Sequence, residues 1–331
     1  MTMQKRNLGN SDLAITPVGL GTWAIGGDGP TSWGPQKDKD SIAAIRRAVE
    51  LGINWIDTAP VYGLGHAETV VAKALKGLSA SERPLVFTKC SLVWDRKRQV
   101  SHCLKPQTLR DEVEQSLKRL KVDVLDLMQI HWPSLPKGAP SPDIEEAWET
   151  LDALVHQGKI RHLGVSNFNE SQLRRIGAIE PVTSNQPPYS MLMREVEEDP
   201  LPYCKDAGIG VIVYSPMHSG LLTDKTTRAW VESLPKDDWR KTKCLAFRDP
   251  LLTEVLELVE LLRTIGARHG RTVCDVAVAW TLANPAVTGA IVGARRPEQL
   301  DGFLGAMEFR LGEEELAEIR AKLPASVELF G

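Results

Sequence analysis

The stretch NWIDTAPVYG, residues 54–63, determines how the rest of this sequence is interpreted. An apolar run ends at Ile56, and a carboxylate, Asp57, follows where the hydrophobicity stops. Five residues later Tyr62 supplies a phenol directly before Gly63. A short buried strand that ends on an acid and opens into a loop of small residues is typical of a barrel mouth, although aspartate also caps ordinary turns. The stretch therefore predicts a strand over residues 53–56 with candidate chemistry at its end.

Outward from this stretch, short apolar runs alternate with helical patterns along the whole chain. The helical segments carry apolar residues at positions such as i, i+3 and i+7, and many begin or end at capping residues. Eight strands that mostly alternate with helices predict a single (β/α)8 TIM barrel of the α/β class over residues 1–331. The expected strands are residues 18–21, 53–56, 85–88, 124–130, 160–165, 182–184, 210–213 and 290–292.

Two additions to the barrel are expected. Residues 1–17 have the pattern of a polar β-hairpin that turns at Gly9-Asn10. Residues 217–248, after the seventh strand, have no clean periodicity, and so long a segment is typical of a functional loop or lid.

A doubly wound open sheet is the alternative fold. Residues 19–24, GLGTWA, match the dinucleotide fingerprint G-x-G-x-x-A after a strand. That fingerprint requires a helix to begin there, so that the helix N-terminus meets the pyrophosphate. The glycine- and proline-rich residues 25–30 that follow exclude such a helix. The barrel is therefore preferred.

Composition excludes several functions. Of 331 residues, 40 are basic and 43 acidic, so no basic excess indicates a nucleic-acid partner. No apolar stretch is long enough to span or target a membrane, and five scattered cysteines without a C-x-x-C motif fit a reducing cytoplasm. Seven dispersed histidines without H-E-x-x-H predict no metal site. We expect a cytoplasmic protein with a small-molecule partner.

The residues that end the expected strands form a consistent set. The active sites of barrels lie at the C-terminal ends of their strands. Each residue alone has an ordinary explanation as a turn former or a solvated strand end, but all of them are polar, aromatic or glycine. The set consists of Gly21, Thr22, Trp23, Asp57, Lys89, His131, Ser166, Asn167, Gln186, Tyr214, Ser215 and Gly293.

Four of the candidate residues together can protonate a carbonyl oxygen. A free phenol such as Tyr62 is a weak acid near neutral pH, with a pKa of about 10. A neighbouring ammonium, Lys89, is expected to lower that pKa, and Asp57 to keep the lysine charged and oriented. His131 can hydrogen-bond the substrate oxygen. Such a site delivers a proton while a hydride arrives from another group.

These residues resemble the aldo-keto reductases, and the resemblance covers nearly the whole chain. At residues 293–297, Gly-Ala-Arg-Arg-Pro, the sequence is most similar to the bacterial branch described as general stress or vegetative reductases. The matching stretches are Gly19-Leu-Gly-Thr-Trp23, Asp57-Thr-Ala-Pro-Val-Tyr62-Gly, Thr88-Lys89, Leu127-Met-Gln-Ile-His131-Trp132, Gly164-Val-Ser-Asn167-Phe, Asn185-Gln186, Tyr214-Ser-Pro216 and Gly293-Ala-Arg295.

The resemblance implies NADPH-dependent reduction of aldehydes or ketones to alcohols. It makes Tyr62 the general acid, tuned by Lys89 and Asp57, with His131 orienting the carbonyl. Trp23 and Trp132 would line the substrate pocket. The NADP(H) site would consist of Gly21, Thr22, Trp23, Asp57, Ser166, Asn167, Gln186, Tyr214, Ser215, Met217, Gly220, Leu221, Gly293, Arg295, Arg296, Gln299 and Asp301.

Cofactor selectivity is expected to depend on the segment after the eighth strand. Arg295 and Arg296, with Gln299 one turn later, can bind the 2′-phosphate that distinguishes NADP from NAD, although paired arginines also occur at solvated helix starts. The sequence departs from the family at Gly302-Phe303, where many members carry an acid and an asparagine near the adenine. Asp301 is the candidate substitute.

Two other functions fit the same residues. A lone lysine on a barrel strand, Lys89, can attack a carbonyl as a Schiff-base aldolase does, but a lysine paired with Asp57 stays protonated and is a poor nucleophile. A catalytically weak NADPH-binding sensor or regulatory subunit on the same barrel is the second alternative.

Overall fold

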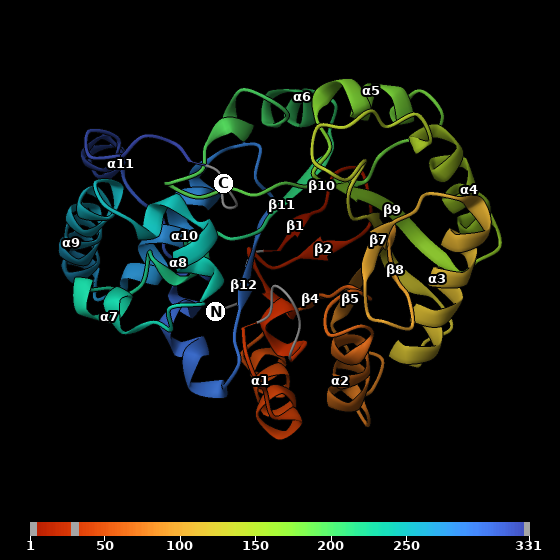
Figure 1. Cartoon of the computed structure of the whole chain (residues 1–331), viewed down its shortest axis with the longest axis horizontal. Coiled ribbons are helices and arrows are strands. Elements are labelled where there is room, and N and C mark those ends of the chain that lie inside the picture. The colour runs from red at the N-terminus through yellow and green to blue at the C-terminus, as the bar shows by residue number, and fades with distance from the viewer. Residues whose placement is uncertain (1–4, 28–32, 328–331) are drawn as a thin grey trace.

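The chain forms a closed barrel of eight parallel strands surrounded by helices (Figure 1). The structure, a computed structural model, describes residues 5–27 and 33–327. Neighbouring strands follow the order β10-β11-β12-β3-β4-β5-β8-β9, so the (β/α)8 prediction is confirmed. The barrel strands are β3 (Val18–Gly21), β4 (Trp55–Asp57), β5 (Leu85–Cys90), β8 (Leu125–Ile130), β9 (Ile160–Ser166), β10 (Ser184–Gln186), β11 (Gly210–Val213) and β12 (Gly289–Gly293).

Helices cover the outside of the barrel and bury their apolar faces against it. Within the described residues, no helix is long and apolar enough to cross a membrane. The helices are α1 (Asp38–Glu50), α2 (His66–Leu75), α3 (Pro106–Leu120), α4 (Ile144–His156), α5 (Glu170–Gly177), α6 (Leu201–Asp206), α7 (Arg228–Ser233), α8 (Trp239–Lys243), α9 (Leu251–His269), α10 (Val273–Ala283) and α11 (Glu313–Arg320).

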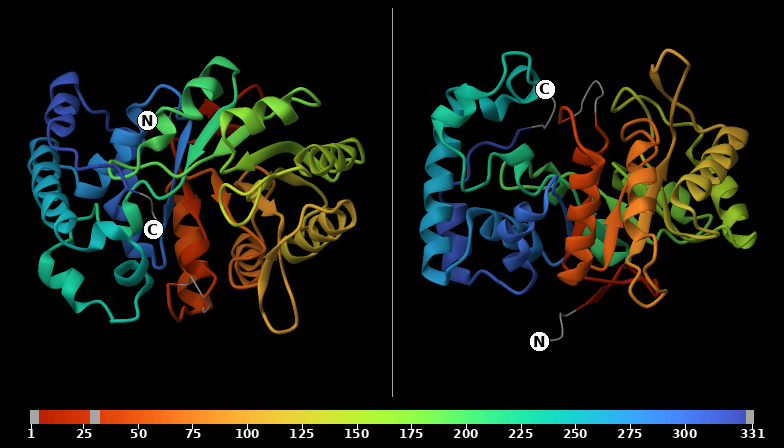
Figure 2. Two further views of the ribbon diagram at one scale, coloured as in Figure 1. Left: turned by 45° about the horizontal axis from the view of Figure 1, so that its top comes forward. Right: turned by 90° about the horizontal axis from the view of Figure 1, so that it is seen from below.

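The N-terminal hairpin closes one end of the barrel. It consists of β1 (Arg6–Asn7) and β2 (Ala14–Ile15), and it turns at Gly9 as predicted, although residues 1–4 lie outside the described part. Its apolar residues Leu8, Leu13 and Ile15 join the barrel-interior cluster of Trp55, Phe87, Leu127, Ile212 and Ile291. In the right view of Figure 2, this hairpin and segment 217–248 lie at opposite ends of the molecule. The other end of the barrel is therefore the one left for a site.

Glycine at position 63 fixes the loop that carries Tyr62. Gly63 has a φ of 63°, and a Cβ there would lie 1.9 Å from the carbonyl oxygen of Gly26. No other residue can occupy this position without moving the backbone. The loop after β4 is thereby held against the loop after β3.

The structure contains elements that the sequence did not predict. A second hairpin, β6 (Leu92–Trp94) and β7 (Val100–His102), follows β5, and α5 and α6 were not expected. Segment 217–248 is not a structureless loop, since it holds α7, α8 and short 3-10 turns. Strand β4 begins at Trp55, two residues later than predicted, and includes Asp57.

Candidate active site

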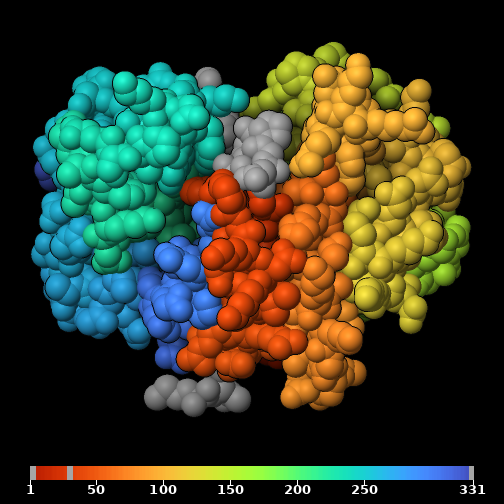
Figure 3. All heavy atoms as spheres, turned by 60° about the horizontal axis from the view of Figure 1, so that its bottom comes forward, coloured from red at the N-terminus to blue at the C-terminus, as the bar shows by residue number. Residues whose placement is uncertain are grey.

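A cavity of about 1550 Å³ lies at the carboxyl ends of the barrel strands. Most of the candidate residues line it: Gly21, Thr22, Trp23, Asp57, Tyr62, His131, Trp132, Ser166, Asn167, Gln186, Tyr214, Ser215, Met217, Gly220, Gly293, Arg295, Arg296 and Gln299. Figure 3 shows segment 217–248, in teal, and the β6–β7 hairpin, in orange, on opposite sides of one face of the molecule. Both segments contribute to the cavity wall.

Lys89 and Asp57 form a buried ion pair beneath this cavity. The side chain of Lys89 has no exposed surface, and its Nζ donates to Asp57 Oδ2 at 2.6 Å and to the carbonyl oxygen of Thr58 at 3.1 Å. The third contact of Nζ is the Tyr62 hydroxyl at 3.3 Å. Burial lowers the pKa of the lysine, while Asp57 opposes that shift through its charge and its hydrogen bond. The ammonium is thus directed at the phenol.

Two glutamines complete the surroundings of Asp57. Gln186 Nε2 donates to Asp57 Oδ1 at 2.8 Å, and Gln129 Nε2 lies 3.5 Å from the same oxygen. Gln186 also donates to Gln129 Oε1 at 3.2 Å. Gln129 was not among the predicted site residues, because it lies inside the apolar run of β8. Strand alternation places Gln129 on the same face as Leu127, which lies in the barrel interior, and this could have indicated that its side chain points inward as Asp57 does.

The phenol of Tyr62 is a protonated group in this environment. Burial is the main cause that raises the pKa of Tyr62 well above its ordinary value, and the charge of Asp57 raises it further. The sequence led us to expect that Lys89 lowers this pKa, and the direction in the structure is the opposite. At neutral pH the hydroxyl carries its proton and can donate it.

His131 lies beside Tyr62, with ring centroids 5.9 Å apart and an edge-to-face arrangement. Its backbone N–H donates to the carbonyl oxygen of Cys90 at 3.0 Å, which ties the end of β8 to the end of β5. Burial and the nearby Lys89 charge hold the pKa of His131 well below its ordinary value. A neutral imidazole next to a protonated phenol can hydrogen-bond the oxygen of a bound carbonyl.

A chain of hydrogen bonds connects the ends of β9, β10 and β11. Asn167 Nδ2 donates to the carbonyl oxygen of His131 at 2.9 Å, and Asn167 Oδ1 accepts from the Tyr214 hydroxyl at 2.9 Å. Ser166 Oγ donates to the carbonyl oxygen of Gln186 at 2.8 Å. Asn167 and Ser215 both have positive φ angles, of 64° and 58°. Such backbone conformations cost energy and concentrate at functional sites.

Aromatic side chains fix segment 217–248 over one side of the cavity. The rings of Trp23, Trp33 and Trp239 contact one another, with centroids between 5.6 and 5.8 Å apart. The guanidinium of Arg240 lies 5.2 Å from the Trp33 ring and 5.8 Å from that of Trp230. Trp239 therefore packs the segment down, and Trp230 and Arg240 also line the cavity. Lys225 lines the cavity as well. Neither Lys225 nor Arg240 was among the site residues predicted from the sequence, because segment 217–248 has no clean periodicity.

A buried polar chain joins the start of this segment to its end. The His218 ring lies 3.2 Å from Ser190 Oγ through Nδ1 and 3.4 Å from Cys244 Sγ through Nε2. Burial lowers the pKa of His218 to about 4 and raises that of Cys244 to about 11. Both groups are therefore neutral near pH 7, and their contact is structural rather than a thiolate–imidazolium pair.

Three of the predicted cofactor residues have surroundings in the structure that the sequence did not indicate. Leu221 is fully buried in the core, and its backbone N–H donates to the carbonyl oxygen of His218. Asp301 is exposed outside the cavity, because the 3-10 turn Pro297–Gly302 directs it outward while Phe303 lines the wall. Arg295 lines the cavity, and its guanidinium donates to Gln36 Oε1 and to the Trp33 carbonyl oxygen, both at 2.8 Å.

Those contacts leave Arg296 as the more accessible of the two arginines. It is exposed at the cavity wall and forms no ion pair within the described chain. Gln299 Oε1 accepts the backbone N–H groups of Arg295 at 2.8 Å and Arg296 at 3.1 Å. Gln299 therefore orients the turn on which Arg296 projects.

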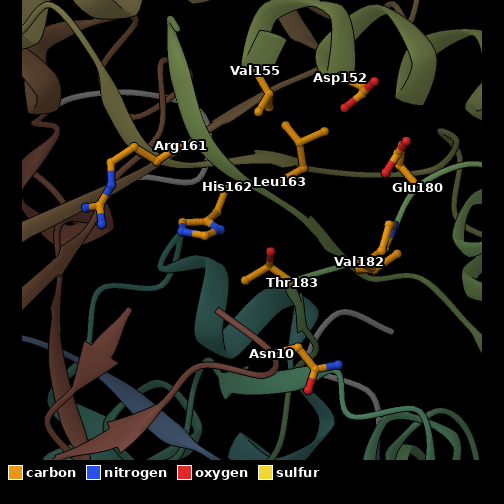
Figure 4. Close-up of a pocket in the computed structure, with 10 residues that line it drawn as sticks. Asn10, Asp152, Val155, Arg161, His162, Leu163, Glu180, Val182 and Thr183 are labelled. Atoms are coloured by element: carbon orange, nitrogen blue, oxygen red, sulfur yellow. The ribbon is translucent and has the colours of Figure 1, made fainter. Parts of the chain in front are cut away.

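A second, smaller pocket of about 230 Å³ lies at the opposite end of the barrel (Figure 4). It is lined by the hairpin turn at Asn10 and by the start of β9. Its two basic residues already pair with Asp12, Arg161 at 2.9 Å and His162 at 2.6 Å. Among residues 5–27 and 33–327, no cluster of His, Cys, Asp and Glu could hold a metal ion.

A buried acid behind β5 makes stability depend on pH. Glu112 accepts the backbone N–H of Ser91 at 2.9 Å, but its Oε1 is buried without a partner. Burial raises the pKa of Glu112 from 4.5 to about 7, so between these values the folded chain binds more protons than the unfolded chain. This acid therefore lowers the free energy of unfolding as pH rises from 4.5 through 7, by about 3 kcal/mol in total.

The substitution Glu112→Gln is expected to remove this contribution. The free energy of unfolding is measured with urea at pH 5 and at pH 8. The difference between variant and wild type should shift in favour of the variant as the pH rises from 5 to 8. Glu149→Gln, on the exposed face of α4, is the matched control. Parallel pH profiles of the wild type and Glu112→Gln would contradict the assignment.

Comparisons with known proteins agree with the fold and place the chain in a family. Residues 17–324 match the Aldo/keto reductase family. The chain is 37% identical to aldo-keto reductase YhdN of Bacillus subtilis, covering 98% of this chain and 95% of that one. It is 36% identical to the NADH-specific methylglyoxal reductase of Escherichia coli, covering 96% and 98%.

A solved structure shares the architecture. The glycerol dehydrogenase AKR11B4 from Gluconobacter oxydans matches with a TM-score of 0.86 and 35% identity, covering 98% of this chain and 96% of that one. The fold is a (β/α)8 barrel, and the family that matches it is one of oxidoreductases. This chain belongs to the aldo/keto reductase family.

Proposed function

We propose that this protein reduces small aldehydes or ketones to alcohols with NADPH, and that Tyr62 donates the proton. The observation that carries the proposal is the contact of the Lys89 ammonium with both Asp57 Oδ2, at 2.6 Å, and the Tyr62 hydroxyl, at 3.3 Å. When Tyr62 gives up its proton, the adjacent Lys89 ammonium stabilises the phenolate that forms. The neutral His131 orients the carbonyl oxygen.

The cavity wall fits a polar cofactor. The hydroxyl oxygens of Thr22 and Ser219 are buried and have no hydrogen-bond partner, although both residues line the cavity. Buried polar atoms normally have partners, so a bound polar molecule would satisfy them. The amides of Asn167 and Gln186 lie on the same side of the barrel and would hold the carboxamide of a nicotinamide, which supplies the hydride when bound.

NADPH rather than NADH is proposed because cations gather on the cofactor side of the cavity. Lys225, Arg240 and Arg296 line one region of the wall, and the charges of Arg240 and Arg296 lower the pKa of Lys225 in addition to its burial. Such mutual repulsion is relieved by a bound phosphate. The NADH-specific relative from Escherichia coli makes cofactor preference an experimental question for this chain.

Fluorescence titration with NADPH and NADH, followed by cofactor oxidation with a panel of aldehydes, tests the proposal. Arg296→Gln is expected to weaken NADPH binding by about tenfold or more, because a guanidinium–phosphate contact contributes about 1.5–3 kcal/mol, and to leave NADH binding unchanged. Arg320→Gln, on the exposed end of α11, is the control. Equal losses for both cofactors would exclude a 2′-phosphate role.

A further inference from the structure

The tip of the β6–β7 hairpin carries three consecutive cations, of which Lys97 and Arg98 line the cavity. The turn sequence 95–99 is DRKRQ, and Asp95 Oδ1 accepts the backbone N–H groups of Lys97 at 2.8 Å and Gln99 at 2.9 Å. The carboxylate of Asp95 is therefore committed to folding the turn. Arg96, Lys97 and Arg98 are exposed, and none of them forms a salt bridge within the described residues. The hairpin tip carries unneutralised positive charge.

This charge belongs to the same cavity as the candidate catalytic residues. Lys97, Arg98 and Val100 line the wall together with Tyr62 and His131. The hairpin follows β5 directly, the strand that carries Lys89. A hydrogen bond of 2.8 Å between His102 Nε2 and the carbonyl oxygen of Trp132 joins β7 to the segment after β8. The tip is thus attached to the loop that follows His131.

The rim cations are separate from those proposed for the cofactor phosphates. In the closed order of eight strands, β5 lies four positions from β11, which is the opposite side of the barrel. Lys225 and Arg240 follow β11, whereas Lys97 and Arg98 follow β5. Figure 1 likewise shows α7 and α8 on one side of the barrel and β7 on the other. A cofactor phosphate that binds Lys225 and Arg240 would therefore not neutralise Lys97 and Arg98, which can bind a different anion.

An apolar wall adjoins the hairpin. Leu64, Leu92, Trp132 and Val100 all line the cavity. Val100 is 42% exposed and therefore presents apolar surface at the cavity mouth. A substrate that meets this wall therefore presents hydrocarbon to it, and a group beyond the hydrocarbon would reach the cationic tip.

We propose that the site prefers negatively charged carbonyl compounds, in which an apolar ring or chain separates the carbonyl carbon from an anionic group held by Lys97 and Arg98. This inference rests on the proposed reductase function and specifies the substrate class of the same site. Ion pairs between the ligand and these solvent-exposed side chains contribute little binding energy. The positive electrostatic field at the cavity mouth, however, raises the rate at which anionic ligands bind by about tenfold or more at low salt.

The test compares two aldehydes that differ only in charge: 4-carboxybenzaldehyde, an anion at pH 7, and its neutral methyl ester, methyl 4-formylbenzoate. The variant is Lys97→Gln/Arg98→Asn, with asparagine chosen because Arg98 has a φ of 64° and asparagine tolerates that conformation. Lys76→Gln/Lys118→Gln removes the same charge from two exposed positions, one directly after α2 and one on α3, and is the control.

In low-salt buffer, the variant is expected to lose about tenfold in kcat/KM for the carboxylate and less than about twofold for the ester, while the control retains both rates. Added salt should lower the wild-type rate for the carboxylate towards that of the variant. Unchanged rates, or equal losses for both aldehydes, would overturn the substrate preference and leave the reductase function intact. A wild type that reduces neither aldehyde, nor any member of the carbonyl panel, would overturn both.

Discussion

Tyr62→Phe is expected to lower kcat for carbonyl reduction by about two to four orders of magnitude, the range that a positioned general acid contributes. The substitution removes only the hydroxyl that lies 3.3 Å from Lys89 Nζ. The phenyl ring can keep its edge-to-face contact with His131, whose centroid is 5.9 Å away, so the cavity should retain its shape. NADPH binding should therefore be unchanged.

Steady-state kinetics with one aldehyde and a fluorescence titration with NADPH separate these two effects. Tyr203→Phe is the matched control, because that ring contacts the Arg174 guanidinium on the protein surface, 4.3 Å from the ring centroid, and lies outside the cavity. Turnover in Tyr62→Phe equal to that of the control would exclude Tyr62 as the proton donor. A protein that binds NADPH tightly but reduces no carbonyl in the wild type would instead support a sensor or regulatory function.

The barrel and its central residues could be predicted because most strands change abruptly from apolar to polar residues at their ends. Asp57 and His131 stand directly after buried runs, and Lys89 ends one, so sequence position alone indicated which end of the barrel they share. Parallel strands bring such positions together whatever the loops do. The structure places Asp57 and Lys89 in contact even though 32 residues separate them.

Features that depend on a few local contacts could not be predicted. The strands of the β6–β7 hairpin have three residues each, and the turn at residues 95–99 is polar throughout, so no alternating pattern marks it. α6 has six residues and begins Leu-Pro, which gives no periodicity. α5 did carry a signal, since Asn169 and Gln172 have capping-box spacing and the structure forms that box.

The two arginines after β12 illustrate a different difficulty. Their sequence context is almost the same, but Arg295 bonds to backbone and side-chain oxygens of the loop after β3, 259 to 262 residues away in sequence. Arg296 remains exposed at the cavity wall. Only tertiary structure distinguishes an arginine that holds a loop from one that can meet a phosphate. The pKa of Tyr62 is a similar case, because the burial that raises it depends on how the surrounding elements pack.

Lys89→Met is expected to lower both activity and stability. Loss of the ammonium leaves the Asp57 carboxylate buried, with 3% of its side chain exposed and Gln186 Nε2 at 2.8 Å as its nearest remaining donor. Removal of one partner from a buried ion pair typically lowers the free energy of unfolding by about 3–5 kcal/mol. Turnover should fall as well, because the phenolate that forms at Tyr62 would lack its neighbouring positive charge.

The double variant Asp57→Asn/Lys89→Met separates the two losses. It removes both charges, so unfolding by urea at pH 7 should show most of the stability regained, since an uncompensated buried charge is no longer present. Activity should not return, because neither substitution restores the ammonium beside Tyr62. Lys76→Met, at an exposed position after α2, should change stability by no more than about 0.5 kcal/mol and leave turnover unchanged. A single Lys89→Met variant as stable as the wild type would show that Asp57 is not a buried carboxylate that depends on this lysine, and full turnover in the double variant would remove Lys89 from the proton transfer.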